Sequence, residues 1–195
     1  MEDLISRKFK EWTKGRDARE ARISIFEKIR DIPYAVIPET LDTAKGHEEM
    51  LRINKGSCQP KHYLLGEMFE RLGILVFYEV YQFRWDELEI DYPRYLKKLT
   101  KKMPTMRHLA CRARIDDELV LVDATCDLPL EKIGIPVNRT WDGFSNLLLP
   151  IIPLDEGEIY HSSEKGYFGP PLFSGIETEF YEKLNKWLDE VRGKI

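Results

Sequence analysis

The sequence predicts an α+β domain in which one central helix leads into an antiparallel sheet. An amphipathic helical pattern from Cys58 to Leu72 runs directly into residues 74–83, which are rich in β-branched and aromatic side chains. Two further strand-like stretches enclose a short polar turn, which is the pattern of a hairpin. Helical patterns also occur before and after this region, so we expect additional helices near both ends of the chain.

The composition of the 195 residues is that of a folded protein, with 43% hydrophobic and 33% charged residues. We expect a single domain over 1–195, with its core at about 20–130. A net charge of −4 gives no basic field, so we expect neither a nucleic-acid nor a membrane partner. Three cysteines without a disulfide-like spacing agree with free thiols and a cytoplasmic location.

The elements before the site are one helix and a long polar loop. Residues 17–29 place apolar side chains four apart, which predicts an amphipathic helix that ends before Pro33. Residues 34–55 are irregular, with a short helical pattern at 47–52. We interpret this stretch as a loop that leads into the site.

The helix from Cys58 to Leu72 carries its own start and stop signals. Ser57 is a favourable N-cap residue, and Pro60 falls in the first turn, where its missing N–H costs little. Gly73 is suited to the C-terminal stop. The spacing therefore places Cys58 at the N-terminus of this helix.

The elements after the first strand are a helix at 93–102, a hairpin of 107–115 with 119–124, and a closing helix. The closing helix begins at a capping-box pattern, Ser174 to Glu177. Apolar residues at helical spacing then mark its buried face.

Cys58 is the candidate nucleophile. The partial positive charge at a helix start stabilises a thiolate, and the backbone N–H groups there can stabilise an oxyanion. The alternative is that Cys58 is simply a small apolar residue packed behind Gly56. Polar flanking residues argue against a buried position: Lys55, Ser57, Gln59 and Lys61.

His108 and Asp123 are the candidate base and orienting residue. If Asp116 and Asp117 form a two-residue turn, His108 lies opposite Thr125, and Asp123 is its diagonal neighbour on the same face. A three-residue loop would send Asp123 to the other face and break this relation. The candidate site therefore predicts the turn.

These residue types suit covalent acyl transfer. His108 would take the proton of Cys58, Asp123 would fix the imidazole tautomer, and the acyl group would pass through a thioester to water or an amine. Taken alone, His108 has an ordinary explanation as a strand histidine, and Asp123 as a turn residue. The three together favour a cysteine hydrolase or acyltransferase.

The other cysteines have no chemical role in this interpretation. Cys111 should point into the core from the other face of the strand, and Cys126 should be a half-buried bystander. A zinc site is disfavoured because there is no Cys-x-x-Cys pair and because His108 and Cys111 should diverge. We expect neither a metal nor a cofactor.

Four stretches follow one another along the chain: residues 29–34 (IRDIPY), residues 55–74 with Gly-x-Cys at 56–58, His108, and Val-Asp-Ala-Thr at 122–125. In order and spacing they resemble the transglutaminase-like superfamily. The resemblance covers about residues 20–130. It implies a papain-like fold, with the nucleophile helix packed on an antiparallel sheet that brings up His108 and Asp123. The superfamily includes transamidases, peptidases, deglycosylating amidases and members that have lost catalysis, so a peptide or protein substrate is implied without a named reaction.

The sequence after His108 departs from the pattern of the superfamily. Many relatives carry a His-x-Trp pattern, whereas Leu109, Ala110 and Cys111 follow the histidine here. The second oxyanion donor has three candidates: Tyr34, Asn54 and Gln59. A catalytically weak or inactive module that binds peptides is the alternative function, with Trp85 and Trp141 offering contact area.

Overall fold

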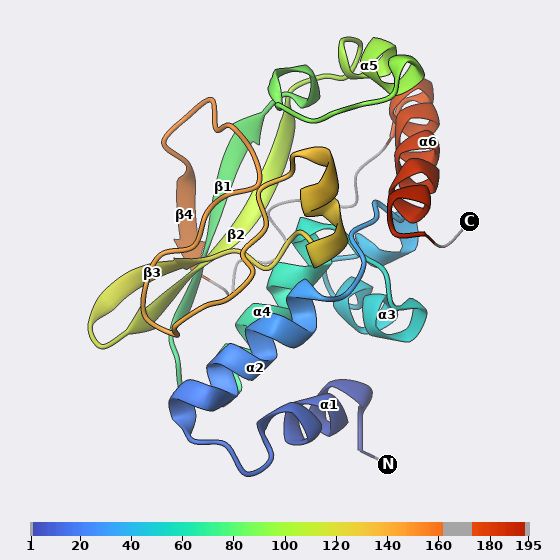
Figure 1. Ribbon diagram of the computed structural model, residues 1–195. Helices are drawn as coiled ribbons and strands as arrows, with labels where there is room; N and C mark the ends of the chain where they lie inside the picture. Colours follow the sequence, from blue (N-terminus) through green and yellow to red (C-terminus); the bar gives the residue numbers. More distant parts are fainter. Residues whose placement is uncertain (1, 162–172, 194–195) are drawn as a thin grey trace.

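A four-stranded antiparallel sheet with the strand order β3-β2-β1-β4 forms the centre of the structure (Figure 1). We describe it from a computed structural model, which covers residues 2–161 and 173–193. The strands are β1 (Val76–Phe83), β2 (Met106–Ile115), β3 (Glu118–Val122) and β4 (Glu158–His161). With its mixture of helices and one small sheet, the fold is of the α+β class, as predicted.

The β2–β3 hairpin has the predicted register. Ile115 pairs with Glu118, and the ladder continues to Cys111 opposite Val122. Asp116 and Asp117 both have positive φ, 49° and 68°, as a two-residue type I′ turn requires. Strand β3 ends at Val122, one residue before Asp123 and two before the predicted end, because the chain there turns toward the helices.

Four helices lie together on one side of the sheet (Figure 1). Helix α4 (Cys58–Arg71) packs against β1 and β2, and α2 (Ala18–Arg30) packs on α4. Helices α1 (Leu4–Thr13) and α3 (Gly46–Ile53) cover α2 and α4 from outside. The main core fills the space between these helices and the sheet, with Leu109, Cys111, Ala113 and Ile115 of β2 among its members.

The ends of α2 and α4 follow the sequence signals, with one exception. Asp17 and Glu20 form a capping box at the start of α2. Ser57 occupies the N-cap position of α4, but its side chain makes no capping hydrogen bond, in contrast to the prediction. Gly73 adopts a positive φ of 78° just after the helix, as a C-terminal stop requires.

A second core lies between the far ends of β1 and β2 and the C-terminal helix α6 (Gly175–Val191). The predicted capping box of Ser174 with Glu177 starts this helix. The remaining elements around this core are short: η1 (Pro38–Thr40), η2 (Trp85–Glu87), α5 (Arg94–Thr100) and η3 (Leu128–Ile133). Trp85 belongs to this second core and Trp141 to the main one, so both tryptophans are buried rather than available as surface contacts.

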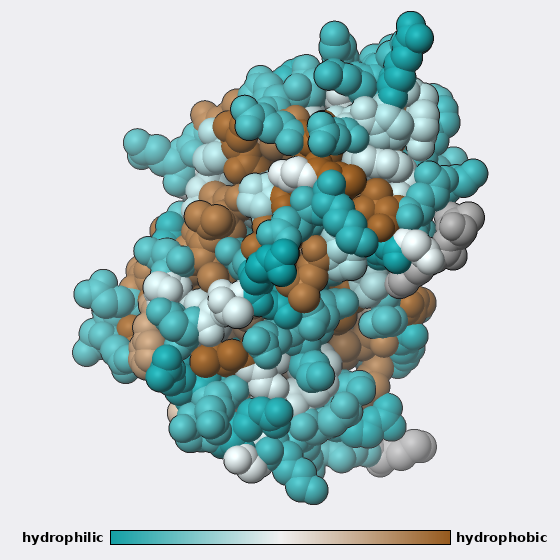
Figure 2. Space-filling model, viewed as in Figure 1, coloured by the Kyte–Doolittle hydropathy of each residue, from teal (hydrophilic) through white to brown (hydrophobic). Residues whose placement is uncertain are grey.

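The face of the molecule seen in Figure 2 carries both hydrophilic and apolar residues. Brown, apolar residues interrupt the hydrophilic surface across the middle of the face in Figure 2, where Figure 1 places the loop between η3 and β4. The exposed apolar side chains of that loop are Phe144, Leu148, Ile152 and Leu154. Within residues 2–161 and 173–193, no helix combines the length and the apolar character that crossing a bilayer requires.

Candidate active site

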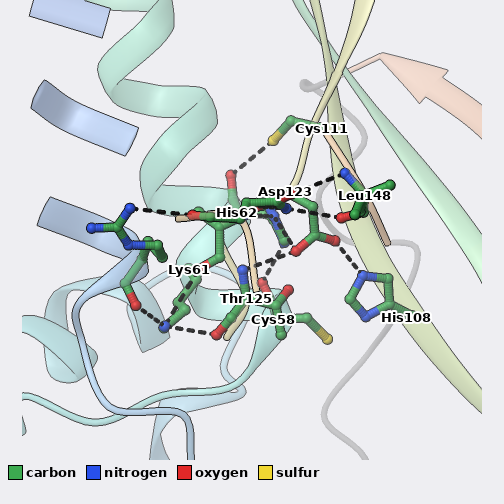
Figure 3. Close-up of polar contacts among 11 residues, drawn as sticks. Cys58, Lys61, His62, His108, Cys111, Asp123, Thr125 and Leu148 are labelled. Carbon is green, nitrogen blue, oxygen red and sulfur yellow. Dashed lines mark hydrogen bonds and ion pairs between the residues drawn. The ribbon is translucent and has the colours of Figure 1, made fainter. Parts of the chain in front are cut away.

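The structure brings Cys58, His108 and Asp123 together where the start of α4 meets the sheet (Figure 3). Cys58 is the first residue of α4 and is half-buried. His108 is the third residue of β2, and Asp123 directly follows β3; both are buried. The ring Nε2 of His108 lies 2.6 Å from Oδ2 of Asp123, so its N–H donates to the carboxylate.

The other ring nitrogen of His108 faces Cys58. Cys58 lies close enough to His108 to contribute to the raised pKa of the imidazole, and Figure 3 shows the sulfur on the side of the ring away from Asp123. The three predicted residues therefore lie together in the order Asp123, His108, Cys58, with a hydrogen bond between the first two. This is the geometry that a thiol, its proton acceptor and an orienting carboxylate require.

The electrostatics favour a charged pair of His108 and Asp123. Burial alone would lower the pKa of His108, but the charge and hydrogen bond of Asp123, together with the interaction with Cys58, raise it to about 10. Burial alone would raise the pKa of Asp123, and the charge of His108 instead holds it below its ordinary value. Near neutral pH, His108 is therefore an imidazolium beside a carboxylate.

His62 is a part of the site that the sequence reasoning missed. It lies one turn after Cys58 on α4 and is fully buried. Its Nδ1 is 2.9 Å from the Cys58 carbonyl oxygen, and its Nε2 accepts a hydrogen bond from the Ala124 N–H at 3.0 Å. Burial, as the main cause, lowers the pKa of His62 to about 4, so the ring is neutral and joins the nucleophile helix to the segment that carries Asp123.

Lys61 is the second residue that was missed, and its position corrects an inference from the sequence. The polar residues beside Cys58 predict an exposed position, yet Lys61 is fully buried and Ser57 is buried too. The Lys61 ammonium donates to the carbonyl oxygens of Thr125 at 2.7 Å and Arg30 at 3.0 Å. Burial lowers the pKa of Lys61 to about 8. The apolar stripe of α4 gave no indication of this role.

Asp123 is held on several sides. Its Oδ1 accepts from the Thr125 N–H at 2.9 Å, which leaves Oδ2 to His108. The side-chain amide of Asn138 donates to the Asp123 carbonyl oxygen at 3.0 Å and to the Leu148 carbonyl oxygen at 2.9 Å. These contacts fix both the backbone and the carboxylate of Asp123 before any substrate binds.

A buried ion pair holds the loop that passes Cys58. Arg192 donates to both carboxylate oxygens of Asp127, each at 2.7 Å, and to the Tyr34 carbonyl oxygen at 2.9 Å. Asp127 also accepts from the Tyr34 N–H at 2.8 Å. Burial opposes ionisation of Asp127, but these hydrogen bonds keep its pKa below the ordinary value. The C-terminal end of α6 is thereby tied to the wall of the site.

The three candidates for a second oxyanion donor differ in their position relative to Cys58 and in their hydrogen bonds. Asn54 is an exposed left-handed residue at the end of α3, away from the wall that contains Cys58. Gln59 lies in that wall, but its amide donates to the Leu41 carbonyl oxygen at 3.0 Å. Tyr34 also lies there, bridged to Gly56; burial and the nearby Cys58 raise its pKa, so its hydroxyl keeps a proton to donate.

The other two cysteines differ in their surroundings. Cys111 points into the main core, as predicted, with its thiol 3.4 Å from the His62 carbonyl oxygen. Cys126 is more buried than predicted and lies in the same cavity wall as Cys58, and burial raises the pKa of its thiol. Within the described part of the chain, no group of three or more His, Cys, Asp or Glu residues is arranged to hold a metal ion.

A cavity of about 330 Å³ opens beside Cys58 and His108. It extends from the start of α4 toward the second core, between the ends of β1 and β2 and helix α6. Its volume is at the lower end of the range for small-molecule sites, about 300–1,000 Å³. A substrate carbonyl at Cys58 could therefore place an attached group in this cavity.

Comparison with known proteins gives one structural likeness. No protein-family model matches the chain, and no curated protein matches it significantly. Among solved structures, it is similar to the crystal structure of "a Putative Cysteine Protease from Cytophaga hutchinsonii", with 18% sequence identity and a TM-score of 0.44. The likeness covers 67% of this chain, and the chain spans 39% of the length of that protein.

Proposed function

We propose that this protein is a thiol-dependent hydrolase or acyltransferase that works through Cys58, His108 and Asp123. The observation that carries the proposal is the position of His108, which lies between the Asp123 carboxylate and the thiol of a half-buried cysteine at a helix start. A structural cysteine does not need a buried imidazole held by a buried carboxylate. The cavity beside the thiol supplies space for a substrate.

The geometry supports the following steps. With the Cys58 proton on His108, the sulfur attacks the substrate carbonyl carbon and forms a C–S bond. The Cys58 N–H at the start of α4 would stabilise the oxyanion, and Tyr34, which lines the same cavity, is our candidate for the second donor. His108 then gives its proton to the leaving nitrogen as the C–N bond breaks, which leaves a thioester on Cys58.

The second half of the reaction returns the enzyme to its starting state. A water molecule or an amine attacks the thioester, gives a proton to His108, and releases the Cys58 sulfur as the C–S bond breaks. Asp123 supports the imidazolium throughout, because its carboxylate stays ionised beside the ring. Whether water or an amine is the acceptor decides between a hydrolase and a transferase.

A papain-like, transglutaminase-like fold is part of the same proposal. It is supported by a cysteine at the start of a helix that packs on an antiparallel sheet, with His108 supplied by β2 and Asp123 by the residue that directly follows β3. The Gly-x-Cys and Asp-Ala-Thr sequences supply independent support. Peptides and proteins are accordingly among the acyl donors to be screened.

The direct test is to trap the acyl group on Cys58. The protein is mixed with activated esters and amides, quenched in acid, digested, and examined by mass spectrometry for an acylated Cys58 peptide. Wild type should show a transient thioester on Cys58, and Cys58→Ala should show no turnover. Cys111→Ala, which alters a core cysteine on the other face of β2, is the control that should keep turnover.

Competition between water and an added amine then separates hydrolysis from transfer, because an amide of the added amine forms only in the second case. Persistent absence of a Cys58 adduct with folded protein would contradict the proposal. That result, combined with peptide binding, would favour the alternative of a non-catalytic binding module.

A further inference from the structure

The walls of the cavity beside Cys58 are mainly apolar. Apolar side chains from four separate parts of the chain line it: Phe83 at the end of β1, Trp85 in η2, Met106 at the start of β2, and Leu184 and Trp187 of α6. The rings of Phe83 and Trp85 are in edge contact with centroids 5.2 Å apart, so this wall is packed like a core.

Three of the described residues in this wall have acidic or basic side chains. Among the described lining residues they are His108, Arg107 and Glu177. His108 is committed to Asp123, Arg107 is exposed, and the Glu177 carboxylate accepts from the Ser174 N–H at 2.8 Å in its capping box. A charged substrate group in the depth of the cavity would lose its hydration without gaining an oppositely charged partner among these three residues, which is costly.

Within the described sheet, the cavity also offers a peptide main chain no unpaired edge to which it could hydrogen-bond. The two strands that reach the cavity, β1 and β2, are the inner strands of the described sheet, because β4 pairs with β1 and β3 with β2. An extended peptide usually adds to a sheet edge, where main-chain groups are unpaired. The edge strands of this sheet are β3 and β4, so the cavity favours a group without main-chain polar atoms.

We infer that the cavity holds the apolar acyl chain of the substrate, with the carbonyl carbon at Cys58 and the leaving group outside. The inference rests on the proposed acyl transfer and names its substrate class. At about 30 Å³ per heavy atom, the share of one water molecule in the liquid, a volume of 330 Å³ accommodates an unbranched chain of about ten carbons. The substrates are therefore esters, thioesters or amides of medium-chain fatty acids.

The test is a chain-length series of p-nitrophenyl esters from acetate to dodecanoate, with the Cys58→Ala rate subtracted. We expect kcat/KM to rise by up to about fourfold per added methylene, the value of burying one such group, and to level off near eight to ten carbons. An N-acetylphenylalanine ester of the same leaving group should be a poorer substrate than the octanoate. A preference for the aromatic ester would overturn the assignment to a linear chain.

A pair of neighbouring variants supplies the structural control. Ile151 is half-buried in the cavity wall, whereas Ile152 is 46% exposed and is not among the lining residues. Ile151→Trp should shorten the preferred chain by several carbons, whereas Ile152→Trp should leave the whole series unchanged. Leu88→Trp, at a second half-buried wall position, replaces Ile151→Trp if that variant does not fold.

The outcomes separate this inference from the proposed function. Turnover that depends on Cys58 but not on chain length would overturn the substrate class and leave acyl transfer standing. If no ester is turned over through Cys58, titration calorimetry of octanamide into the Cys58→Ala protein tests the cavity alone. Binding that Ile151→Trp weakens at least tenfold would support the apolar ligand, whereas no binding of octanamide would overturn it.

Discussion

Replacing His62 by glutamine should change how the stability of the protein depends on pH. His62 is fully buried and neutral, and its pKa is lowered from 6.5 to about 4, chiefly by burial. Between these two values the unfolded chain binds a proton at this residue and the folded protein does not. Acidification therefore favours the unfolded state, and the stability that His62 contributes is present above pH 6.5 and lost as the pH falls toward 4.

The magnitude follows from the width of that window. At 1.36 kcal/mol per pH unit, lowering the pH from 6.5 to 5 should reduce the free energy of unfolding by about 2 kcal/mol through His62 alone. Glutamine can still accept from the Ala124 N–H but cannot also reach the Cys58 carbonyl oxygen, so His62→Gln should cost about 1–2 kcal/mol at pH 7.5. The stability curves of wild type and variant should therefore converge or cross near pH 5.

Urea unfolding followed by tryptophan fluorescence at pH 5, 6, 7 and 7.5 measures both curves. The difference between them isolates His62, because the carboxyl groups of the protein titrate in both. A difference that stays constant from pH 7.5 to 5 would mean that His62 takes up a proton equally in the folded and unfolded states, contrary to a lowered pKa in the fold.

Three further perturbations have expected outcomes. Arg192→Met leaves Asp127 as a buried, unpaired charge and should lower the free energy of unfolding by about 3–5 kcal/mol in urea titrations. Adding Asp127→Leu should recover part of the loss. An unchanged free energy of unfolding in Arg192→Met would contradict a buried pair. Lys61→Met leaves the Arg30 and Thr125 carbonyl oxygens without their donor and should cost about 1–3 kcal/mol in the same assay, whereas an unchanged midpoint would show that water replaces the ammonium. Asp116→Asn with Asp117→Gly suits the two positive φ angles and should raise thermal stability by about 1 kcal/mol without changing turnover; destabilisation would contradict the type I′ turn.

The hairpin and its two site residues could be predicted because strand geometry has a simple period. Side chains alternate between faces, so a two-residue turn at Asp116 and Asp117 was enough to place Asp123 near His108. The position of Cys58 at the start of α4 could be predicted as well, because residues 56–60 carry helix-start signals. In both cases the relevant contacts lie within about 15 residues along the chain.

Lys61 and His62 could not be predicted in this way. Their partners, Ala124 and Thr125, are more than 60 residues away, and a polar residue on α4 is buried only because that segment crosses the helix. Lys61 next to the nucleophile therefore suggests an exposed surface, whereas Lys61 and His62 connect α4 to the segment that follows β3. The role of Asn138 depends in the same way on a loop whose path has no local signal.

The buried environment of Tyr34 illustrates the same limit. The sequence pattern of its loop predicts only irregular structure. In the fold, a bridge to Gly56 and hydrogen bonds with Arg192 and Asp127, from two other parts of the chain, hold Tyr34 in place. The cavity wall depends on α6, which closes over the ends of β1 and β2 from the far end of the sequence. Substrate preference is therefore a property of long-range packing rather than of any motif.

Alkylation of Cys58 measures whether His108 activates this thiol. Iodoacetamide labelling is followed by peptide mass spectrometry from pH 5 to 9, in wild type and in His108→Ala, with the buried Cys111 as the internal reference. We predict that Cys58 reacts at pH 6 at least tenfold faster than a free peptide thiol, and that His108→Ala abolishes this advantage. Equal labelling rates of Cys58 with and without His108 across this pH range would contradict the account.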